Sequence, residues 1–365
     1  MKKISPERRS YYKSAAFSRW QNELNRKNKR YDPDKSYPKK IILGQKVIVA
    51  PEYISIYELE GFHSPYNRTM QFVEEIHKNY KLSDCLIDFS DTRKISAAAL
   101  VVVYAAMEIA GKGRAGKASV ALSRKSPGVN KLLKSSNLIK LISGQEISYS
   151  LDSARSMPIV SSVGSDQMDE IIDFIQRRIF KDQMSPDTEH VYGDAVSETI
   201  NNVGLHAYPN TPLDERRWWL MCSTFGRELY LAIYDCGVGI PKTVVSQSWF
   251  FPLLKHIDPD RYQELTKNIP ELEAYGLQIL VPKQIPDERL IYYSMQNDVS
   301  GTKQEKHGQG SKSIKALVND TEDGLLWVFS NNGLYTFNVE DQKPGEAKLK
   351  RKFPGTLVQW NIEIS

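Results

Sequence analysis

The stretch that most constrains the fold runs Tyr230-Leu-Ala-Ile-Tyr-Asp-Cys-Gly-Val-Gly-Ile-Pro241. Its apolar first part is typical of a buried strand, and that strand ends at Asp235. Gly237 and Gly239 follow, and glycines in such a turn let a ligand approach the backbone closely. The Asp235 carboxylate can accept a hydrogen bond from the exocyclic amine of adenine. The full string makes the simpler alternative, a strand that ends in an ordinary glycine turn, a poor explanation.

A second polar segment precedes this strand and runs Asp194-Ala-Val-Ser-Glu-Thr-Ile-Asn-Asn-Val-Gly-Leu-His-Ala-Tyr208. On a helix, Glu198 and Asn202 lie four residues apart and project from one face. An amide oxygen suits Mg²⁺ as a ligand, and a carboxylate one turn away can orient or deprotonate an attacking hydroxyl or water. Taken alone, the segment fits equally well an amphipathic helix whose polar face meets solvent.

A third segment runs Lys306-His-Gly-Gln-Gly-Ser-Lys-Ser-Ile-Lys315, in which glycines open a predicted helix. Backbone N–H groups and the positive end of a helix favour phosphate groups. Alone, so short a glycine pattern is not specific. Lys303 lies just before it and can reach a phosphate, although an exposed lysine is the simpler interpretation.

The stretch between Pro241 and Gly308 is sixty-six residues long and rich in aromatic residues. These are Trp249, Phe250, Phe251, Tyr262, Tyr275, Tyr292 and Tyr293. So many aromatic side chains indicate a packed insert that covers a nucleotide or meets a partner. An elaborated loop is the alternative that the sequence leaves open.

In this order, the three segments resemble the nucleotide site of the GHKL superfamily, which includes the ATPases of gyrase, the heat-shock chaperone, histidine kinases and mismatch repair. The resemblance covers about Ser165 to Ser365. Within it, Ala195-Val-Ser-Glu to Asn202 and His206-Ala-Tyr208 look most like the corresponding helix of the anti-sigma-factor serine kinases. The resemblance implies an α/β fold, a Bergerat-type sandwich with a mixed sheet, and ATP and Mg²⁺ as its cofactors.

The same resemblance implies a role for each matched residue, with Glu198 as the catalytic base and Asn202 as the Mg²⁺ ligand. It assigns to the nucleotide Asn201, Asp235, Gly237, Gly239, Ile240, Lys303, Gly308, Gln309, Gly310, Ser311 and Thr356. Of these, the aspartate holds adenine and the first two glycines line its pocket. The threonine, from Pro354-Gly-Thr-Leu357, supports the aspartate, and the later two glycines meet the phosphates from a lid.

The sequence lacks a histidine-kinase phosphoacceptor helix and a P-loop. His63 is followed by Ser-Pro, and His190 lies at the start of the helix that carries Glu198. Histidine autophosphorylation is therefore disfavoured.

The first half predicts an α/β unit with a largely parallel sheet, because apolar strands alternate with helices. Asp84 to Ile142, with Ile87-Asp-Phe-Ser-Asp-Thr92 and Ser126-Pro-Gly-Val-Asn-Lys-Leu-Leu133, resembles a STAS domain, the fold of anti-sigma-factor antagonists. Such domains often carry a phosphorylated serine at the start of the buried helix. Here the matching place falls at Ala98, and the nearest hydroxyl belongs to Ser96. The resemblance therefore implies a fixed docking or dimerisation module.

Hydrophobic periodicity divides the chain into elements. In the first half we expect strands at 47–49, 86–89 and 118–122 and helices at 67–81, 96–110 and 126–142. In the second half we expect a helix capped by Ser165, a helix at 189–208, hairpins at 217–235 and 324–338, and a last strand at 356–364. The hairpin at 324–338 is expected to turn at Asn331-Asn332-Gly333. The predicted domains are a basic arm at 1–40, a STAS-like domain at 41–150, a linker at 151–164 and a GHKL-like domain at 165–365 whose lid or insert spans about 242–310.

Composition excludes several classes of protein. Of the 365 residues 41% are hydrophobic and 25% charged, which is ordinary for a globular chain. The longest apolar run, Ala97 to Met107, is interrupted by Glu108 and is too short to span a bilayer. The three cysteines form neither a disulfide framework nor a C-x-x-C pair for zinc. We therefore expect a reduced, cytoplasmic protein without a secretory signal, and the resemblance to anti-sigma-factor kinases implies a bacterial one.

The positive charge is concentrated at the beginning of the chain. Residues 1–40 hold thirteen Lys/Arg and four Asp/Glu, a net charge of +9, although the whole chain carries only +5. Tyr11, Tyr12, Phe17 and Trp20 interrupt this charge, and basic residues interleaved with aromatic ones can follow a nucleic-acid backbone and stack on bases. The alternative is a solvated extension that docks its aromatic residues on a neighbouring surface.

These observations predict a GHKL-type ATPase or serine/threonine protein kinase in which nucleotide state is coupled to partner contacts. The alternative is an ATP-gated interaction switch with little or no turnover. The expected partners are ATP, a protein of unknown identity, and either a second copy or another chain in a complex. Nucleic acid bound through residues 1–40 is a weaker expectation, and no membrane partner is expected.

Overall fold

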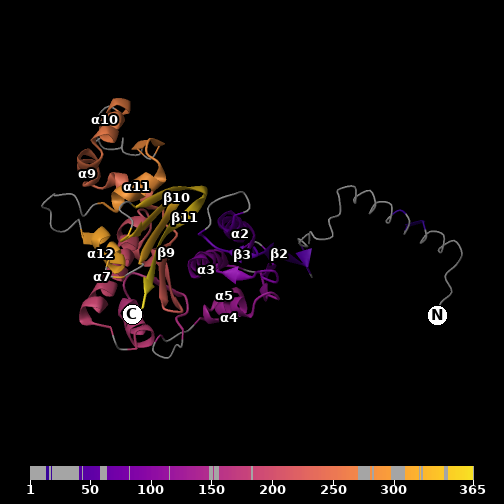
Figure 1. Ribbon diagram of the computed structural model, residues 1–365. Coiled ribbons are helices and arrows are strands. Elements are labelled where there is room, and N and C mark those ends of the chain that lie inside the picture. The colour runs from indigo at the N-terminus through magenta and orange to yellow at the C-terminus, as the bar shows by residue number, and fades with distance from the viewer. Residues whose placement is uncertain are drawn as a thin grey trace, which may run out of the picture. The chain divides into compact units, whose positions relative to one another are not determined.

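The computed structural model describes residues 41–364 except for gaps at 43, 58–63, 82, 115, 148–150, 152–155, 182–183, 270–279, 282, 297–308, 320, 322–323 and 341–343, and it also describes residues 14, 15 and 18. Ile41–Ser365 group as one compact unit. This unit is a mixed α/β structure, in which a parallel α/β region is followed by an antiparallel sheet packed with helices (Figure 1). In the described part of the chain, no helix is long and apolar enough to cross a membrane.

The N-terminal region is built on a four-stranded sheet in the order β1-β2-β4-β6. Its strands are β1 (Ile41–Ile42), β2 (Gln45–Val49), β4 (Cys85–Asp88) and β6 (Ala118–Ala121). The last three pair in parallel, as the alternation of strands and helices predicted, and the short strands β3 (Tyr53–Ile54) and β5 (Lys94–Ile95) form a separate parallel pair.

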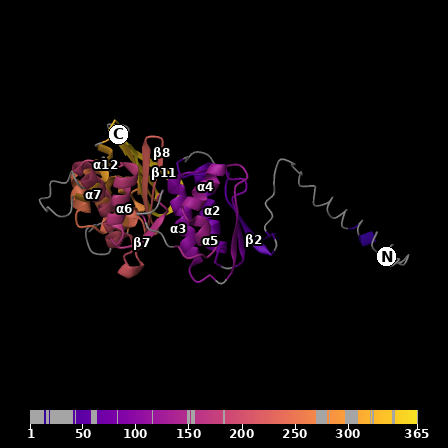
Figure 2. The same ribbon diagram turned by 90° about the horizontal axis from the view of Figure 1, so that it is seen from below.

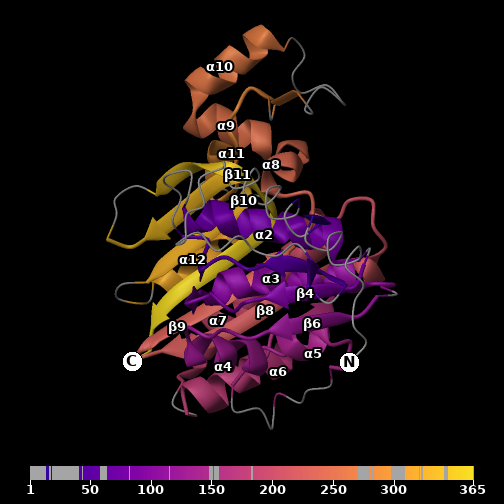
Figure 3. The ribbon, with the colours of Figure 1, turned by 90° about the vertical axis from the view of Figure 1, so that its right-hand side faces the viewer.

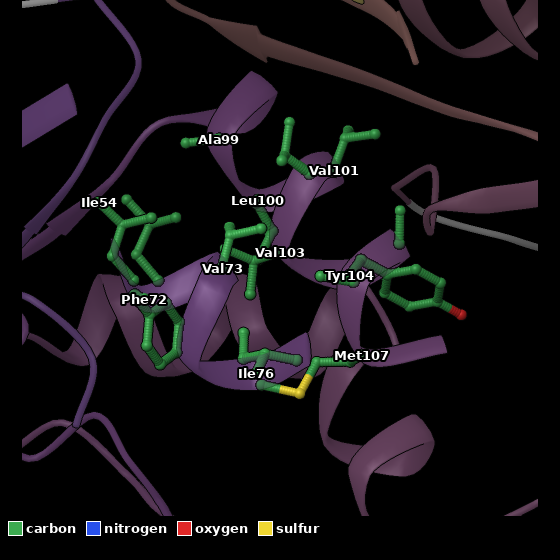
Figure 4. Packing of buried hydrophobic residues seen from close by; sticks show 14 of the residues in the cluster. Ile54, Phe72, Val73, Ile76, Ala99, Leu100, Val101, Val103, Tyr104 and Met107 are labelled. Carbon is green, nitrogen blue, oxygen red and sulfur yellow. The ribbon is translucent and has the colours of Figure 1, made fainter. Parts of the chain in front are cut away.

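Four helices accompany these strands, and they are α2 (Pro65–Asn79), α3 (Ala97–Gly111), α4 (Pro127–Ser135) and α5 (Leu138–Ile142). Helix α3 is small and apolar on nearly every side, so it is buried almost throughout. Figure 4 shows Val73 and Ile76 of α2 beside Leu100 and Val103 of α3. The prediction of one helix at 126–142 is wrong, because Asn137 adopts φ 64° and separates α4 from α5.

The second sheet has the order β10-β11-β9-β8-β7. Its strands are β7 (Val160–Val163), β8 (Arg217–Phe225), β9 (Glu228–Asp235), β10 (Leu325–Asn338) and β11 (Gly345–Glu363). All of its described pairs are antiparallel. The hairpin formed by β8 and β9 is confirmed.

Two expectations for this sheet are wrong. Asn331-Asn332-Gly333 does not form a hairpin turn, because strand β10 continues through these residues with two shifts in its register against β11. The strand therefore has a bulge here and does not end. Residues 160–163 of the expected linker form the edge strand β7, since they pair with β8. In both places long-range pairing, which local sequence does not reveal, decides the structure.

Helices cover one face of this sheet. They are α6 (Met168–Phe174), α7 (Pro186–Asn202) and α12 (Gln309–Asn319), and α6 and α7 continue as the π-helical segments η1 (Ile175–Ile179) and η2 (Val203–Ala207). A short 3-10 turn, η3 (Leu213–Glu215), precedes β8. Ser165 does not cap α6, which begins after Gln167. Helix α7 begins earlier than expected, because the Ser185 hydroxyl accepts a hydrogen bond from the Thr188 N–H and caps it there.

The N-terminal region covers the opposite face of the sheet (Figures 2 and 3). Helix α3 contacts β8 and β9, and α2 contacts β11. Trp219, Tyr234 and Phe353 of the sheet belong to the same buried cluster as the core of the N-terminal region. The central part of this sheet is therefore buried on both faces.

A helical lobe follows β9 and lies beyond the ends of β10 and β11 in Figure 1. Its elements are α8 (Ile240–Thr243), the 3-10 turn η4 (Val244–Ser246), α9 (Phe250–Ile257), α10 (Pro259–Asn268) and α11 (Asp287–Ser294). The lobe has its own hydrophobic cluster, to which Phe250, Phe251 and Tyr293 belong. The aromatic stretch is thus a packed insert in its described part, and α11 joins it to β10.

Candidate functional site

Asp235 ends β9 and is buried, with 5% of its surface exposed. It pairs with Thr356 of β11 on one side and with Trp218 of β8 on the other. Because side chains alternate between the faces of a strand, Tyr234 points to the N-terminal region while Asp235 points to the face that the helices cover. The expected neighbour Thr356 is therefore beside Asp235.

The environment of Asp235 favours its protonated form. Burial raises the pKa of this carboxyl group to about 7, while hydrogen bonds from the backbone of Gly237 and Thr356 act in the opposite direction. The Gly237 N–H lies 2.7 Å from Asp235 Oδ1. A buried carboxyl that two backbone groups orient is well suited to recognise a hydrogen-bond donor on a ligand.

The turn after Asp235 depends on its two predicted glycines. A Cβ at Gly237 would lie 2.2 Å from the Ala207 carbonyl oxygen, and one at Gly239 would lie 2.5 Å from Asn331 Nδ2. Gly239 also has φ 91°, which a residue with a side chain rarely adopts. Ile240 follows and begins α8, which lies partly exposed at the edge of the turn.

The bulge in β10 supports the same turn, and sequence reasoning missed this. The Ser330 hydroxyl accepts a hydrogen bond from the Ile240 N–H at 2.9 Å and lies 3.1 Å from Thr356 Oγ1. The side-chain amide of Asn331 donates to the Val238 carbonyl oxygen, and its own Oδ1 is buried without a described partner. The local signal, two asparagines before a glycine, favours a hairpin turn, so it pointed away from this role.

Helix α7 brings the predicted acid and amide together. Asn202 Nδ2 donates a hydrogen bond to Glu198 Oε1 at 3.1 Å, and both side chains are half-buried. Asn201, also predicted to bind the nucleotide, is exposed on the same helix. The hydrogen bond engages the amide nitrogen of Asn202, so the amide oxygen, the atom that suits a Mg²⁺ ion, is not the one bonded to Glu198.

The end of this helix is fastened to the turn after Asp235. The Val238 N–H donates to the Ala207 carbonyl oxygen at 2.8 Å, at the end of η2. The Tyr208 hydroxyl donates to the Arg217 carbonyl oxygen at 2.7 Å and accepts from the Cys236 N–H at 2.9 Å. Burial, together with the Asp235 charge, holds the pKa of Tyr208 well above its usual value, so the hydroxyl keeps its proton.

The third predicted segment is described only in part. Lys303 and Gly308 lie outside the described residues, and of Gln309 and Gly310 the structure gives the backbone at the start of α12. Ser311 is buried in α12, which packs against α7. The start of the glycine-led helix is therefore at Gln309.

The residues present fit a nucleotide better than a metal bound by protein side chains alone. Among the described residues, no group of three or more His, Cys, Asp or Glu side chains is placed to hold a metal ion. A Mg²⁺ ion held chiefly by phosphate oxygens needs only one or two protein ligands. Asn202 has an amide oxygen of the kind that such an ion accepts as a ligand. The Cβ positions of Gly237 and Gly239 are filled by Ala207 and Asn331, so these glycines serve the close packing of the turn itself.

The structure has two other places with features of a binding site, a cavity beside α7 and a buried hydroxyl at the start of α3. A cavity of about 510 Å³ lies beside Asp187 and Tyr192 in the first turns of α7, about 9 to 16 Å along the helix from Glu198 at 1.5 Å per residue. In the N-terminal region, Ala98 is buried in α3, and the Ser96 hydroxyl at the start of that helix is buried without a described partner. Neither place brings together the predicted site residues.

No family model matches the chain, and no curated protein or solved structure is significantly similar to it. The fold that the structure supports is a parallel α/β region followed by an antiparallel sheet with helices.

Proposed function

We propose that this protein binds Mg²⁺-ATP at the end of β9 and hydrolyses it or transfers its γ-phosphate to a serine or threonine of another protein. The observation that carries the proposal is the buried Asp235 carboxyl in a glycine turn, which is bonded to the end of the helix that bears Glu198 and Asn202. The GHKL-like and STAS-like assignments of the two regions belong to the same proposal.

Adenine recognition is the part that Asp235 supports. Its carboxylate accepts a hydrogen bond from the exocyclic amine of adenine, and the tight packing of Gly237 and Gly239 against Ala207 and Asn331 holds the turn that follows it. Guanine presents an acceptor oxygen at the corresponding position, so it pairs unfavourably with the ionised carboxylate, the form that predominates above about pH 7. The site should therefore prefer adenine nucleotides to guanine nucleotides.

The phosphate chemistry is the part that α7 supports. A Mg²⁺ ion held by Asn202 would neutralise charge on the phosphates. Glu198, one turn away, is placed to take a proton from an attacking water or hydroxyl. The backbone N–H groups at the start of α12 are suited to phosphate oxygens, and this helix packs on α7.

A second candidate function is an ATP-gated interaction switch with little turnover. It is favoured by the helical lobe formed by α8, α9, α10 and α11, which has its own core and adds surface beside the turn at Gly239. In that case Glu198 would position Asn202 rather than act as a base.

One experiment distinguishes the two candidate functions. Adenine nucleotide binding and phosphate release are measured in the wild type, Asp235→Asn and Glu198→Gln, with Glu189→Gln on the same helix as the matched control. We expect Asp235→Asn to lose binding, and Glu198→Gln to keep binding but lose release by roughly 10²-fold or more.

Each result leads to a distinct conclusion. Binding without release in the wild type would favour the switch, or a kinase that lacks its protein substrate, and labelled phosphate on an added protein would distinguish them. If the wild type binds neither ATP nor ADP, the proposed site is wrong. If Glu189→Gln impairs release as much as Glu198→Gln, the base is wrongly assigned.

A further inference from the structure

A single charged residue interrupts the apolar helix α3, and it faces the antiparallel sheet. Glu108 Oε2 accepts hydrogen bonds from the Ser161 hydroxyl of β7, at 2.7 Å, and from the indole nitrogen of Trp219 in β8. Glu108 Oε1 lies 3.8 Å from an Arg217 guanidinium nitrogen, and that nitrogen also donates to Ser161. Donors from two strands therefore converge on one carboxylate of the N-terminal region.

The polar contacts of Glu108 are more than is needed to hold the N-terminal region against the sheet. The Glu108 side chain is 23% exposed and the Arg217 side chain 29% exposed, so both charges are largely removed from water. Such a removal is costly, and apolar contacts alone, which α3 makes along the rest of its length, would hold the helix in place. Buried charge pairs are better suited to fixing one particular geometry than to adding stability.

The geometry that Glu108 fixes leads to the candidate nucleotide site. The side chain of Arg217 lies close to Glu108. The backbone carbonyl oxygen of the same residue accepts a hydrogen bond from the Tyr208 hydroxyl. The same hydroxyl accepts a hydrogen bond from the N–H of Cys236, the residue after Asp235. Three contacts thus connect α3 to the turn at Asp235.

A second observation places the Glu108 charge near this turn. Burial raises the pKa of the Cys236 thiol to about 12, the hydrogen bond with Tyr234 lowers it, and the negative charges of Asp235 and, less strongly, Glu108 raise it. The carboxylate of α3 therefore acts electrostatically on the residue whose N–H Tyr208 holds.

We propose that Glu108 is a positioning residue through which the N-terminal α/β region regulates the nucleotide site, by way of Arg217, Tyr208 and the backbone of Cys236. This inference rests on the proposed function. A partner or modification that shifts α3 would alter the turn beside Asp235 and hence the affinity for ATP, and bound ATP would shift α3 in return.

The test compares two carboxylates that cross the same interface. Glu108→Gln keeps the shape of the side chain but removes its charge. Glu74→Gln is the matched control, because Glu74 of α2 pairs with Arg351 of β11 at 3.1 Å but has no described contact with Tyr208 or Arg217. ATP affinity is measured by calorimetry, and amide hydrogen exchange is followed at Cys236 and Val238 in the full chain without nucleotide.

We expect Glu108→Gln to weaken ATP binding about three- to tenfold and to speed exchange at both amides, and Glu74→Gln to change neither. In the double variant Glu108→Gln/Tyr208→Phe, the two effects on affinity should be less than multiplicative, because both changes break one path.

The inference is overturned if Glu108→Gln leaves exchange and affinity unchanged, if Glu74→Gln has an equal effect, or if the double variant shows the full product of the single effects. If the wild type does not bind ATP, the proposed function fails by itself. Exchange at Cys236 in the nucleotide-free protein still decides whether Glu108 positions the turn.

Discussion

The side-chain amide of Asn331 lies 3.1 Å from the carbonyl oxygen of Val238 and donates a hydrogen bond to it, so a bulge in β10 holds the turn that follows Asp235. Asn331 is 4% exposed and adopts φ 51°, a left-handed conformation that asparagine tolerates better than most residues. Its neighbour Asn332 donates its backbone N–H to Asp287 of α11, and among the described residues no hydrogen bond of its side chain is found.

This difference between two adjacent asparagines gives a first prediction. Asn331→Gly keeps a backbone that tolerates φ 51° but loses the bond to Val238, so ATP affinity should fall about five- to tenfold. Asn332→Ala removes a side chain without that bond and should leave affinity near the wild-type value. Isothermal titration of both variants checks this, and an equal loss in the two would show that the bulge acts only through its backbone.

The pH dependence of stability gives a second prediction. Burial raises the pKa of Asp235 to about 7, whereas an unfolded aspartate titrates near 4. Between these values the folded protein keeps a proton that the unfolded chain has released. The contribution of Asp235 to the free energy of unfolding should therefore fall as pH rises from about 4 to about 7, by up to about 1.4 kcal/mol per pH unit.

The variant Asp235→Asn does not ionise, so it should lack this part of the slope. Urea unfolding of wild type and variant at pH 5, 6 and 7 measures the difference. Parallel pH profiles for the two proteins would show that Asp235 titrates normally in the folded state.

A third prediction concerns two glycines, whose replacement by alanine should change the free energy of unfolding in opposite directions. A methyl group at Gly237 would meet the Ala207 carbonyl oxygen, so Gly237→Ala should destabilise the fold by about 1–3 kcal/mol. Gly193 lies within α7 with open space around its Cβ position, so Gly193→Ala should stabilise the helix by up to about 1 kcal/mol. Tryptophan fluorescence during urea unfolding reports both, and a neutral Gly237→Ala would mean that the turn relaxes easily.

A fourth prediction concerns the N-terminal region. A chain that begins at residue 151 would expose Trp219, Tyr234 and Phe353, which the N-terminal region now buries. Apolar patches of this kind promote association. We expect this fragment to bind a hydrophobic dye strongly and to aggregate, whereas a chain that begins at residue 41 should remain monodisperse in light scattering. A well-folded, monodisperse 151–365 fragment would contradict this expectation.

The elements that sequence analysis predicted well are those with strong local patterns. The apolar helix at α3, the parallel strands around it and the hairpin ending at Asp235 follow from periodicity and turn residues. The contact between Glu198 and Asn202 follows from helical spacing. Each of these elements shows its pattern within a short stretch of sequence, even where, as for the parallel strands, its partner is distant.

The features that sequence analysis missed depend on distant partners. Val160–Val163 looks like a linker until β8 supplies its pair, and Asn331-Asn332-Gly333 looks like a hairpin turn until β11 continues beside it. The approach of Ser330 and Asn331 to the turn after Asp235 likewise depends on residues about ninety positions apart. Local propensity gives way where such tertiary pairing is available.

The covering of the sheet by the N-terminal region also sets the order in which the chain can reach its final structure during synthesis. Tyr57 bonds to Gln359, 302 residues later, and Tyr66 bonds to the Arg351 carbonyl, 285 residues later. At 5–20 residues per second, a ribosome needs on the order of 15 to 60 seconds to make the stretch between such partners. During that time the strands that will cover the apolar surface of the first region have not yet been made, so we expect the nascent chain to be prone to aggregation.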